Sequence, residues 1–268
     1  MYIQNIFLKI ISIFYTFIFL YLNIFIVIKN MSFDIVIPTT KKDLNTLEEC
    51  IAACKKYIKN YRNIIVISDK QYTNNALWFN EDNFQFSKND LINIIGEHWR
   101  FGWYYQQLLK LYAPFTIPNI SDNILILDSD TIFLKNIDFF HDNKPCYNYG
   151  TANHKPYFRH MKQLHSDLTR QDKKKSGICH HMIFQTHILR ELFYKIETKH
   201  KKDFWRIFLE SVDLSEKSGA SEYEIYFNYI LKFHNENIKI RRLQWENSSK
   251  IDDNKDLHYV SKHSYLKV

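Results

Sequence analysis

Strand and helix patterns alternate through the first half of the chain, and this alternation constrains the fold more than any other feature. An apolar run at residues 33–38 predicts a buried strand, and residues 44–61 carry apolar side chains at helical spacing. Residues 63–68, rich in Ile and Val, predict a second strand, and residues 103–112 predict a helix that Pro114 ends. Such alternation is typical of a mostly parallel α/β sheet flanked by helices.

The second half of the chain contains further helix and strand patterns and shows no internal repeat. Strands are predicted at residues 178–184, 238–245 and 257–260, and helices at residues 186–198, 201–211 and 221–233. No flexible linker interrupts the sequence after its first 30 residues, so we expect one folded domain there.

Two carboxylates follow the apolar run at residues 124–127. Asp128 and Asp130 are separated by one serine, and an apolar stretch resumes directly after Thr131. A buried strand does not hold unpaired carboxylates without compensation. Side chains at positions i and i+2 point the same way along an extended segment, so both could bind one hard cation, Mg²⁺ or Mn²⁺, which could hold a diphosphate. Placement after a strand favours this over an ordinary acidic loop, because ligands of open α/β sheets bind at that edge.

The N-terminus differs from the rest of the chain. Residues 10–28 carry no charged side chain and are long enough to cross a bilayer as a helix. No small-residue cleavage site follows, which disfavours a cleaved signal peptide. We therefore predict a single-pass membrane protein with its anchor in residues 1–30 and its folded domain in residues 31–268. Translation from Met31 would instead give a cytoplasmic protein that begins just before the first strand.

Composition excludes several classes of protein. The formal charge of +7 is spread along the chain and fits a solvated basic surface that attracts phosphates or anionic lipid. Zinc-finger spacing and an aromatic RNA-binding motif are both absent from the sequence, so no nucleic-acid partner is expected. The cysteines imply buried free thiols rather than a disulfide framework or a zinc site. They are Cys50, Cys54, Cys146 and Cys179.

Four segments in a fixed order resemble the metal-dependent nucleotide-sugar glycosyltransferases of the GT-A fold. They are residues 33–43, 100–111, 127–131 and 221–226. More narrowly, the chain resembles bacterial and viral glycosyltransferase-like proteins that mostly lack an assigned substrate. The resemblance implies a Rossmann-like catalytic domain that uses Mn²⁺ or Mg²⁺. It would move a sugar from a nucleoside-diphosphate sugar to a glycan, lipid or protein acceptor.

The resemblance also implies which residues bind the donor. Lys42 and Asp43 would contact its base, ribose or phosphate, although Asp43 equally suits a helix cap. Arg100 lies in a predicted loop and could bind phosphate through two hydrogen bonds. Gln106 and Lys110 share one helix face, where Lys110 could approach the donor phosphates as a point charge or remain a solvated helix lysine.

The metal ligands follow from the same resemblance. Asp128 would reach the ribose or act through water, and Asp130 would bind the metal directly. The cation would offset the charge that grows on the leaving nucleoside diphosphate. His258 and His263 are candidates for a third ligand, with a surface position as the alternative for each.

Glu222 and Glu224 belong to the fourth segment and are the catalytic candidates. Glu222 is the first choice, either to orient an acceptor hydroxyl or act as base in an inverting reaction, or to stabilise positive charge in a retaining one. Alternatively it opens a helix, where the dipole favours a carboxylate. His180 and His181 are adjacent on a predicted strand and face opposite ways, so at most one of them faces the site.

Two rival functions are weighed. Phosphatases of the haloacid dehalogenase type also place two aspartates after a strand, but their motif puts one residue between the second aspartate and the threonine. Here Thr131 follows Asp130 directly. The non-enzyme alternative is an inactive glycosyltransferase-like scaffold that binds a nucleotide sugar or a partner. Turnover of a nucleotide sugar would separate this scaffold from an enzyme.

Overall fold

The computed structural model describes residues 32–252 and 255–263. The predicted anchor in residues 1–30 lies outside these residues and stays a prediction. Within the described part, no helix is both long and apolar enough to cross a membrane.

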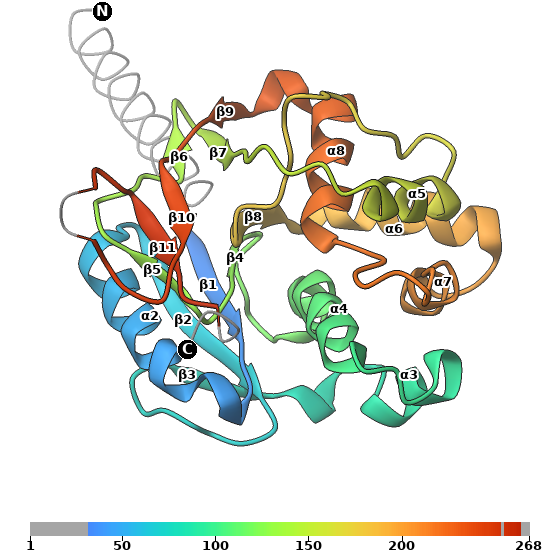
Figure 1. Ribbon diagram of the computed structural model, residues 1–268, viewed down its shortest axis with the longest axis horizontal. Coiled ribbons are helices and arrows are strands. Elements are labelled where there is room, and N and C mark those ends of the chain that lie inside the picture. Colours follow the sequence, from blue (N-terminus) through green and yellow to red (C-terminus); the bar gives the residue numbers. More distant parts are fainter. Residues whose placement is uncertain (1–31, 253–254, 264–268) are drawn as a thin grey trace, which may run out of the picture.

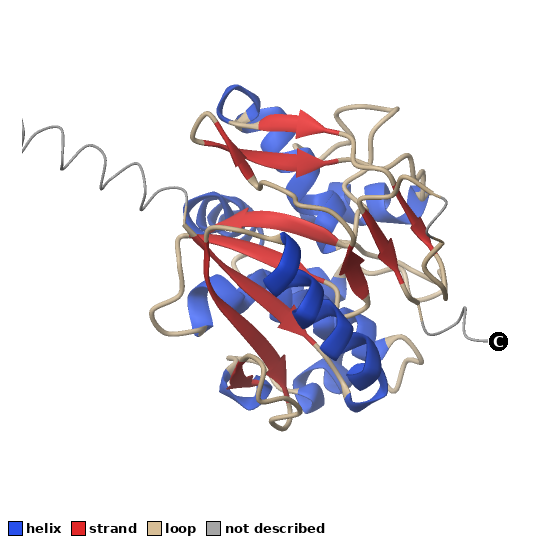
Figure 2. Ribbon diagram, turned by 90° about the vertical axis from the view of Figure 1, so that its left-hand side faces the viewer, coloured by secondary structure: helices blue, strands red, loops and turns tan. Residues whose placement is uncertain are grey.

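A five-stranded sheet lies at the centre of the molecule, with strand order β3-β2-β1-β4-β8 (Figures 1 and 2). Its strands are β1 (Phe33–Pro38), β2 (Tyr61–Ser68), β3 (Leu77–Asn80), β4 (Asn123–Leu127) and β8 (His181–Gln185). β1 pairs in parallel with β2 and β4, and β2 pairs in parallel with β3. β8 runs antiparallel to β4. The predicted mostly parallel sheet is therefore confirmed.

Helices cover both faces of this sheet. Figure 2 shows α2 (Leu44–Tyr57) lying across one face, and Figure 1 places α4 (Phe101–Thr116) on the other side of the strands. The remaining helices are α3 (Lys88–Ile95), α5 (Lys155–Leu164), α6 (Thr186–His200), α7 (Phe204–Glu210) and α8 (Glu222–Phe233), with 3-10 turns η1 (Lys41–Asp43), η2 (Glu81–Asn83) and η3 (Asn235–Asn237). The strands and the apolar helix faces share one hydrophobic core.

Two small sheets complete the fold. One has the order β10-β11-β5 and the other the order β6-β7-β9. Their strands are β5 (Thr131–Phe133), β6 (Phe140–His141), β7 (Lys144–Asn148), β9 (Lys239–Arg241), β10 (Trp245–Asn247) and β11 (Tyr259–Ser261). β11 pairs antiparallel with β5, opposing Ser261 to Thr131. This pairing returns the end of the chain to the residues that follow β4.

Several element ends differ from those predicted. The helix expected to stop at Pro114 continues to Thr116, where the amide of Ile117 bonds the carbonyl of Ala113 at 3.1 Å. Pro114 has no amide hydrogen to donate to the carbonyl of Lys110, so one bond of the helix is lost there while the bond after it is kept. The helix expected over residues 44–61 ends at Tyr57, which leaves room for β2 to begin earlier.

Candidate active site

Three segments meet at the edge of the central sheet where β1 and β4 end. β2 lies on one side of β1 and β4 on the other, so the strand order reverses here, which is where open α/β sheets bind ligands. Val36 pairs with Ile126, so the two strands finish at the same edge. β8 starts at that edge because it is antiparallel, with His181 opposite Leu127.

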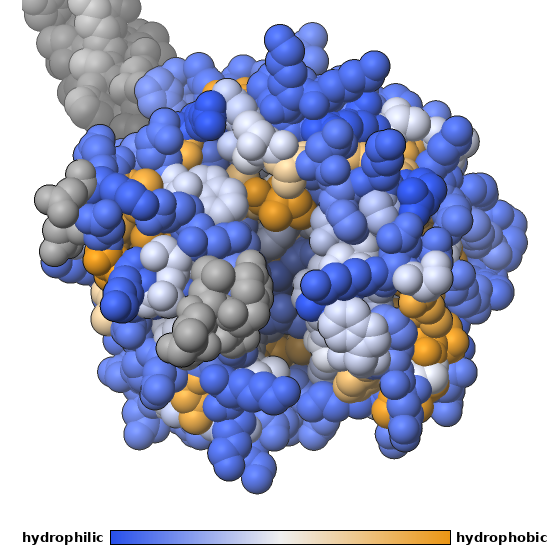
Figure 3. Space-filling view, in the orientation of Figure 1, coloured by the Kyte–Doolittle hydropathy of each residue, from blue (hydrophilic) through white to orange (hydrophobic). Residues whose placement is uncertain are grey.

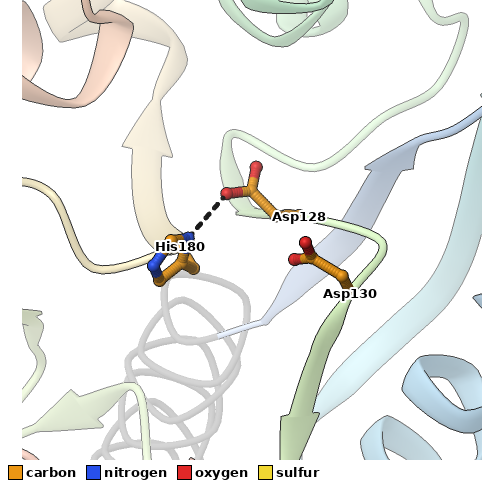
Figure 4. A group of neighbouring side chains, drawn as sticks. All are labelled: Asp128, Asp130 and His180. Atoms are coloured by element: carbon orange, nitrogen blue, oxygen red, sulfur yellow. Dashed lines mark hydrogen bonds and ion pairs between the residues drawn. The ribbon is translucent and has the colours of Figure 1, made fainter. Parts of the chain in front are cut away.

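Asp128 and Asp130 lie in a tight turn, and the extended geometry expected for them is wrong. β4 ends one residue before Asp128, and the amide of Thr131 bonds the carbonyl of Asp128 at 3.0 Å, which closes the turn before β5. The amide of Asp128 in turn bonds the carbonyl of His180 at 2.9 Å. The turn, and not the alternation of a strand, brings the two carboxylates together (Figure 4).

His180 joins the two aspartates in a group with the donor atoms of a metal site. One ligand atom from each of Asp128, Asp130 and His180 lies within 4.8 Å of the others. Atoms that share a cation at about 2.1 Å lie about 3–4 Å apart, so the three ligand atoms are near the spacing of a metal site. Two carboxylates and an imidazole suit Mn²⁺, and less closely the harder Mg²⁺.

The conformation of His180 is consistent with a role at this group. Its backbone is left-handed, with φ of 61°, a conformation that costs about 1–3 kcal/mol and concentrates at functional sites. Nδ1 lies 3.2 Å from Oδ2 of Asp128. Nε2 is buried and has no hydrogen-bond partner among the described residues. Neutral imidazole nitrogens are common metal ligands, and within the part of the chain that the structure describes this one has no protein partner that would compete with a cation.

His263 lies beside Asp130 at the end of the described chain. Its Nδ1 is 3.0 Å from Oδ2 of Asp130, and Ser261 donates to the other carboxylate oxygen at 3.1 Å. Burial alone would lower the pKa of His263, but the adjacent Asp130 outweighs it and holds the pKa above its ordinary value. The His263 and His180 rings are 4.8 Å apart, so His263 lies near enough to act as a further ligand.

Lys110 is a buried cation between two carboxylates. Its ammonium group contacts Oδ1 of Asp128 and lies 2.5 Å from Oε1 of Glu222. Tyr223 also donates to Oδ1 of Asp128, at 3.2 Å, and its ring lies 4.5 Å from the ammonium. Lys110 was expected to meet donor phosphates or water, but in the structure protein carboxylates surround it.

The charges of Lys110, Asp128 and Glu222 stabilise one another in a buried environment. Burial alone would lower the pKa of Lys110, but Asp128 and Glu222 outweigh it and raise that pKa above the ordinary value. Burial opposes ionisation of Asp128 as well, yet Lys110 and His180 hold the pKa of that carboxyl well below its usual range. The pKa of Glu222 is raised, by burial first and by Asp128 second, against the attraction of Lys110.

Glu222 is the first residue of α8, and a buried glutamine fixes its backbone. Oε1 of Gln107 accepts from the amide of Glu222 at 3.0 Å, and Nε2 of Gln107 donates to the carbonyl of Ala220 at 3.4 Å. The hydroxyl of Ser221 caps the helix by accepting from the amide of Glu224 at 3.3 Å. α4 and the start of α8 are thereby held together at the cavity.

Gly177 allows the segment before β8 to pass close to α8. A Cβ atom at this position would lie 2.5 Å from the carbonyl oxygen of Tyr223 and 2.6 Å from Cβ of Phe227. No real side chain tolerates such contacts with a backbone. A glycine is therefore required for His180 to reach Asp128 while α8 stays in place.

Asp128, Asp130 and His180 line a cavity of about 710 Å³. The surface is hollowed near the centre of the face seen in Figure 3. Most of the predicted site residues line this cavity. They are Asp43, Arg100, Gln106, Lys110, Asp128, Asp130, Glu222 and His263. No site role was predicted for the aromatic side chains at its walls, which are Trp103, Tyr157, Tyr223 and Trp245.

Three predicted site residues do not line this cavity. Lys42 is exposed in η1. Glu224 is buried one turn into α8 and accepts hydrogen bonds from Ser176 and Asn228, as a structural carboxylate does. His258 links two small-sheet segments through its backbone and lines a separate cavity of about 470 Å³.

Only one histidine of the adjacent pair enters the cavity, as expected, but His180 precedes β8 in a left-handed conformation and is not a strand residue. His180 faces the cavity, and the ring of His181 packs against Phe133, Phe139 and Tyr259. Burial lowers the pKa of His181 to about 3, so its ring is a neutral part of the core. The turn into β8, and not the alternation of a strand, therefore directs His180 into the site while His181 faces the core.

Comparison with known proteins identifies a family without identifying an activity. A family model described as a family of unknown function (DUF6492) matches residues 18–265. The chain belongs to this family. The description of the family assigns no reaction to the chain.

Among solved structures, one that resembles the chain is the crystal structure of mouse xyloside xylosyltransferase 1 in its apo form. The two are 12% identical, the match covers 88% of this chain and 99% of that one, and the TM-score is 0.43. A likeness at this level assigns neither a substrate nor a reaction. None of the curated proteins matches the sequence.

Proposed function

We propose that the protein is a metal-dependent glycosyltransferase that moves a sugar from a nucleoside-diphosphate sugar to an acceptor. The observation that carries this proposal is the Asp128, Asp130 and His180 group in a cavity at the point where the strand order reverses. The resemblance of four ordered sequence segments to nucleotide-sugar glycosyltransferases supports it. The acceptor is a glycan, lipid or protein, and the predicted anchor would hold the enzyme at a membrane.

In this proposal Asp128, Asp130 and His180 hold Mn²⁺ or Mg²⁺, with His263 nearby. A bound cation would supply positive charge for the donor diphosphate and its leaving group. Lys110 and Tyr223 both donate to one oxygen of Asp128, so they fix that carboxylate and leave its other oxygen toward His180. These residues keep the donor end of the cavity ordered before any ligand enters.

Glu222 supplies the carboxylate for the acceptor in this proposal. It lines the cavity as the first residue of α8, and its carboxylate shares the ammonium group of Lys110 with Asp128 of the aspartate turn. A buried carboxylate with a raised pKa is better suited to accept a proton from a hydroxyl than a solvated one. Lys110 links Glu222 to Asp128, so the donor and acceptor ends share one buried cation.

A thermal-shift experiment with nucleoside diphosphates tests the donor site. Uridine, guanosine, adenosine and cytidine diphosphates are each added with and without Mn²⁺. At least one should raise the melting temperature only when Mn²⁺ is present, because ligands that bind the folded state stabilise it by mass action. Asp130→Asn should remove this stabilisation.

The matched control is Asp256→Asn, at an exposed aspartate that pairs with Lys135 outside the cavity. It should bind the nucleotide as wild type does. Stabilisation that survives in Asp130→Asn, or that needs no metal in wild type, would contradict the metal site.

A further inference from the structure

Arg100 forms a second charged end of the cavity. It precedes α4, lines the cavity wall, and donates to the hydroxyl of Ser218 at 2.7 Å. Its guanidinium lies 4.5 Å from the ring of Trp103 and 5.2 Å from the ring of Trp99. Stacking and one hydrogen bond therefore hold the guanidinium in place on the cavity wall.

The charge of Arg100 lacks a carboxylate partner. Among the described residues, no carboxylate oxygen lies within 4.0 Å of its guanidinium nitrogens. The Nε atom of Arg100 is buried and has no hydrogen-bond partner among the residues that the structure describes. Arginine at a cavity wall with unused donors is suited to bind a carboxylate or phosphate, which it recognises through two parallel hydrogen bonds. Lys110, by contrast, already has two carboxylate partners.

Arg100 lies about three helical turns before Lys110, away from the metal group. It precedes Lys110 by ten residues. At about 1.5 Å per residue, that places their backbones about 15 Å apart along the helix axis. Lys110 touches Asp128, so the metal group lies at its end of the cavity.

Tyr157 lies between the two ends. Burial raises the pKa of Tyr157 to about 12, the charge of Glu222 adds to the rise, and the charge of Arg100 opposes it. The tyrosine is therefore within electrostatic range of both residues. Its ring lies 6.2 Å from that of Trp103, and both line the cavity. Two aromatic rings thus form a wall from Glu222, the proposed acceptor carboxylate, to Arg100.

We propose that the acceptor is an anionic saccharide, whose carboxylate or phosphate pairs with Arg100 while its sugar ring lies against Trp103 and Tyr157. This inference rests on the proposed function, because it names the acceptor for the same cavity. Aromatic walls with a few placed polar groups are typical of sites for small polar ligands. The donor end requires a metal, and the Arg100 end does not.

A binding experiment without donor or metal tests the inference. Methyl β-D-glucuronide, methyl β-D-glucoside 6-phosphate and neutral methyl β-D-glucoside are titrated into the full chain and followed by saturation-transfer NMR. At least one acidic glycoside should bind about 10-fold or more tightly than the neutral one. The acidic glycoside that binds more tightly identifies the anion as a carboxylate or a phosphate. Arg100→Gln should weaken its binding by about 10–100-fold, which is the worth of hydrogen bonds to a charged group.

The matched control is Arg206→Gln. Arg206 also stacks on a tryptophan, 4.3 Å from the Trp205 ring, but lies outside the cavity. It should bind as wild type does. If Arg100→Gln fails to fold, Ser218→Ala replaces it, because this variant releases the guanidinium, together with the Tyr157 side chain that also bonds Ser218, and should weaken binding several-fold. Equal binding of acidic and neutral glycosides, or a preference unchanged in these variants, would overturn the inference.

The outcome separates this inference from the proposed donor site. Metal-dependent nucleotide binding that Arg100→Gln reduces as much as Asp130→Asn would assign Arg100 to the donor and overturn the inference. An acidic preference that depends on Arg100, in a protein that binds no nucleotide, would instead remove the donor proposal and retain the anion site.

Discussion

Lys110 stabilises charges that would otherwise repel each other. Asp128 and Glu222 both contact its ammonium group, and the three side chains are at most 19% exposed. Two buried carboxylates without a cation would have to take up a proton or move apart. Lys110 therefore stabilises the fold by neutralising both carboxylates, which explains why a lysine occupies a position that is almost fully buried.

Replacing this cation should be strongly destabilising. Lys110→Met keeps the length of the side chain and leaves two buried carboxylates unpaired, which should lower the free energy of unfolding by about 3–5 kcal/mol. Urea unfolding followed by circular dichroism measures this. The control Lys202→Met, at a half-exposed lysine that pairs with the exposed Glu210, should cost less than about 1 kcal/mol. Equal stabilities for the two variants would show that the buried group is not coupled as described.

Glu222 should matter for transfer more than for donor binding. Glu222→Gln retains an oxygen toward Lys110, so packing should survive, while turnover should fall by about 10²–10⁴-fold at unchanged nucleotide affinity. Glu224→Gln is the matched control, because Glu224 lies on the same helix outside the cavity. Full activity of Glu222→Gln would exclude it from the chemistry, and weakened donor binding alone would place it at the donor end.

At the scale of elements, the site depends on how α4 meets α8. Gln107 crosses between them and bonds two backbone groups at the start of α8. Gln107→Leu should leave both groups buried without partners and cost about 1–3 kcal/mol each. Thermal unfolding measures the loss. Gln106→Leu provides the comparison, because Gln106 makes one long bond of 3.4 Å to Pro38 and should cost less. A larger loss of stability in Gln106→Leu than in Gln107→Leu would mean that packing, and not these hydrogen bonds, holds α4 against α8.

The sequence predicted the strands that are buried on both faces. β1, β2 and β4 were predictable because central parallel strands are buried on both faces and therefore form unbroken apolar runs. β3 was missed because Leu77 and Trp78 at its start are exposed, at the sheet edge. α3 was missed within a polar stretch, although Ser87 and Asp90 form a capping box that marks its start.

The parts of the site that were missed depend on contacts between residues far apart in the sequence. Asp128 and Asp130 are close in sequence, so their pairing was visible, even though the turn that joins them was not. The partners of Lys110 lie 18 and 112 residues away, and no local pattern encodes such a contact. His180 reaches the site because β8 runs antiparallel, and strand direction depends on packing across the whole sheet.

At the scale of the whole molecule, a histidine remote from the cavity should make the fold sensitive to acid. His160 on α5 is buried, bonds the carbonyl of Phe208 at 2.8 Å, and has its pKa lowered by burial to about 4. The unfolded chain binds a proton at about pH 6.5, and the folded chain does not until about pH 4. Stability is therefore fully present above about pH 6.5 and falls by about 3 kcal/mol as the pH drops to about 4.

A single substitution isolates this effect. His160→Gln keeps a donor for the Phe208 carbonyl and removes the titrating group. The free energy of unfolding, measured against pH for both proteins, should fall less steeply in the variant, by the uptake of about one proton between pH 6.5 and 4. Parallel curves for the two proteins would show that the acid sensitivity has another source.

The reversed direction of β8 also bears on how this protein could diversify. The segment that enters β8, and not the one that leaves it, reaches the cavity, and it contributes Thr151, Ala152, Tyr157, Ile178 and His180 to the wall. Insertions or deletions between β7 and α5, beside Thr151 and Ala152, would reshape this wall while the strands kept their register, because loops tolerate changes in length that sheets do not. Related proteins could exchange acceptors over evolutionary time without rebuilding the aspartate turn on β4.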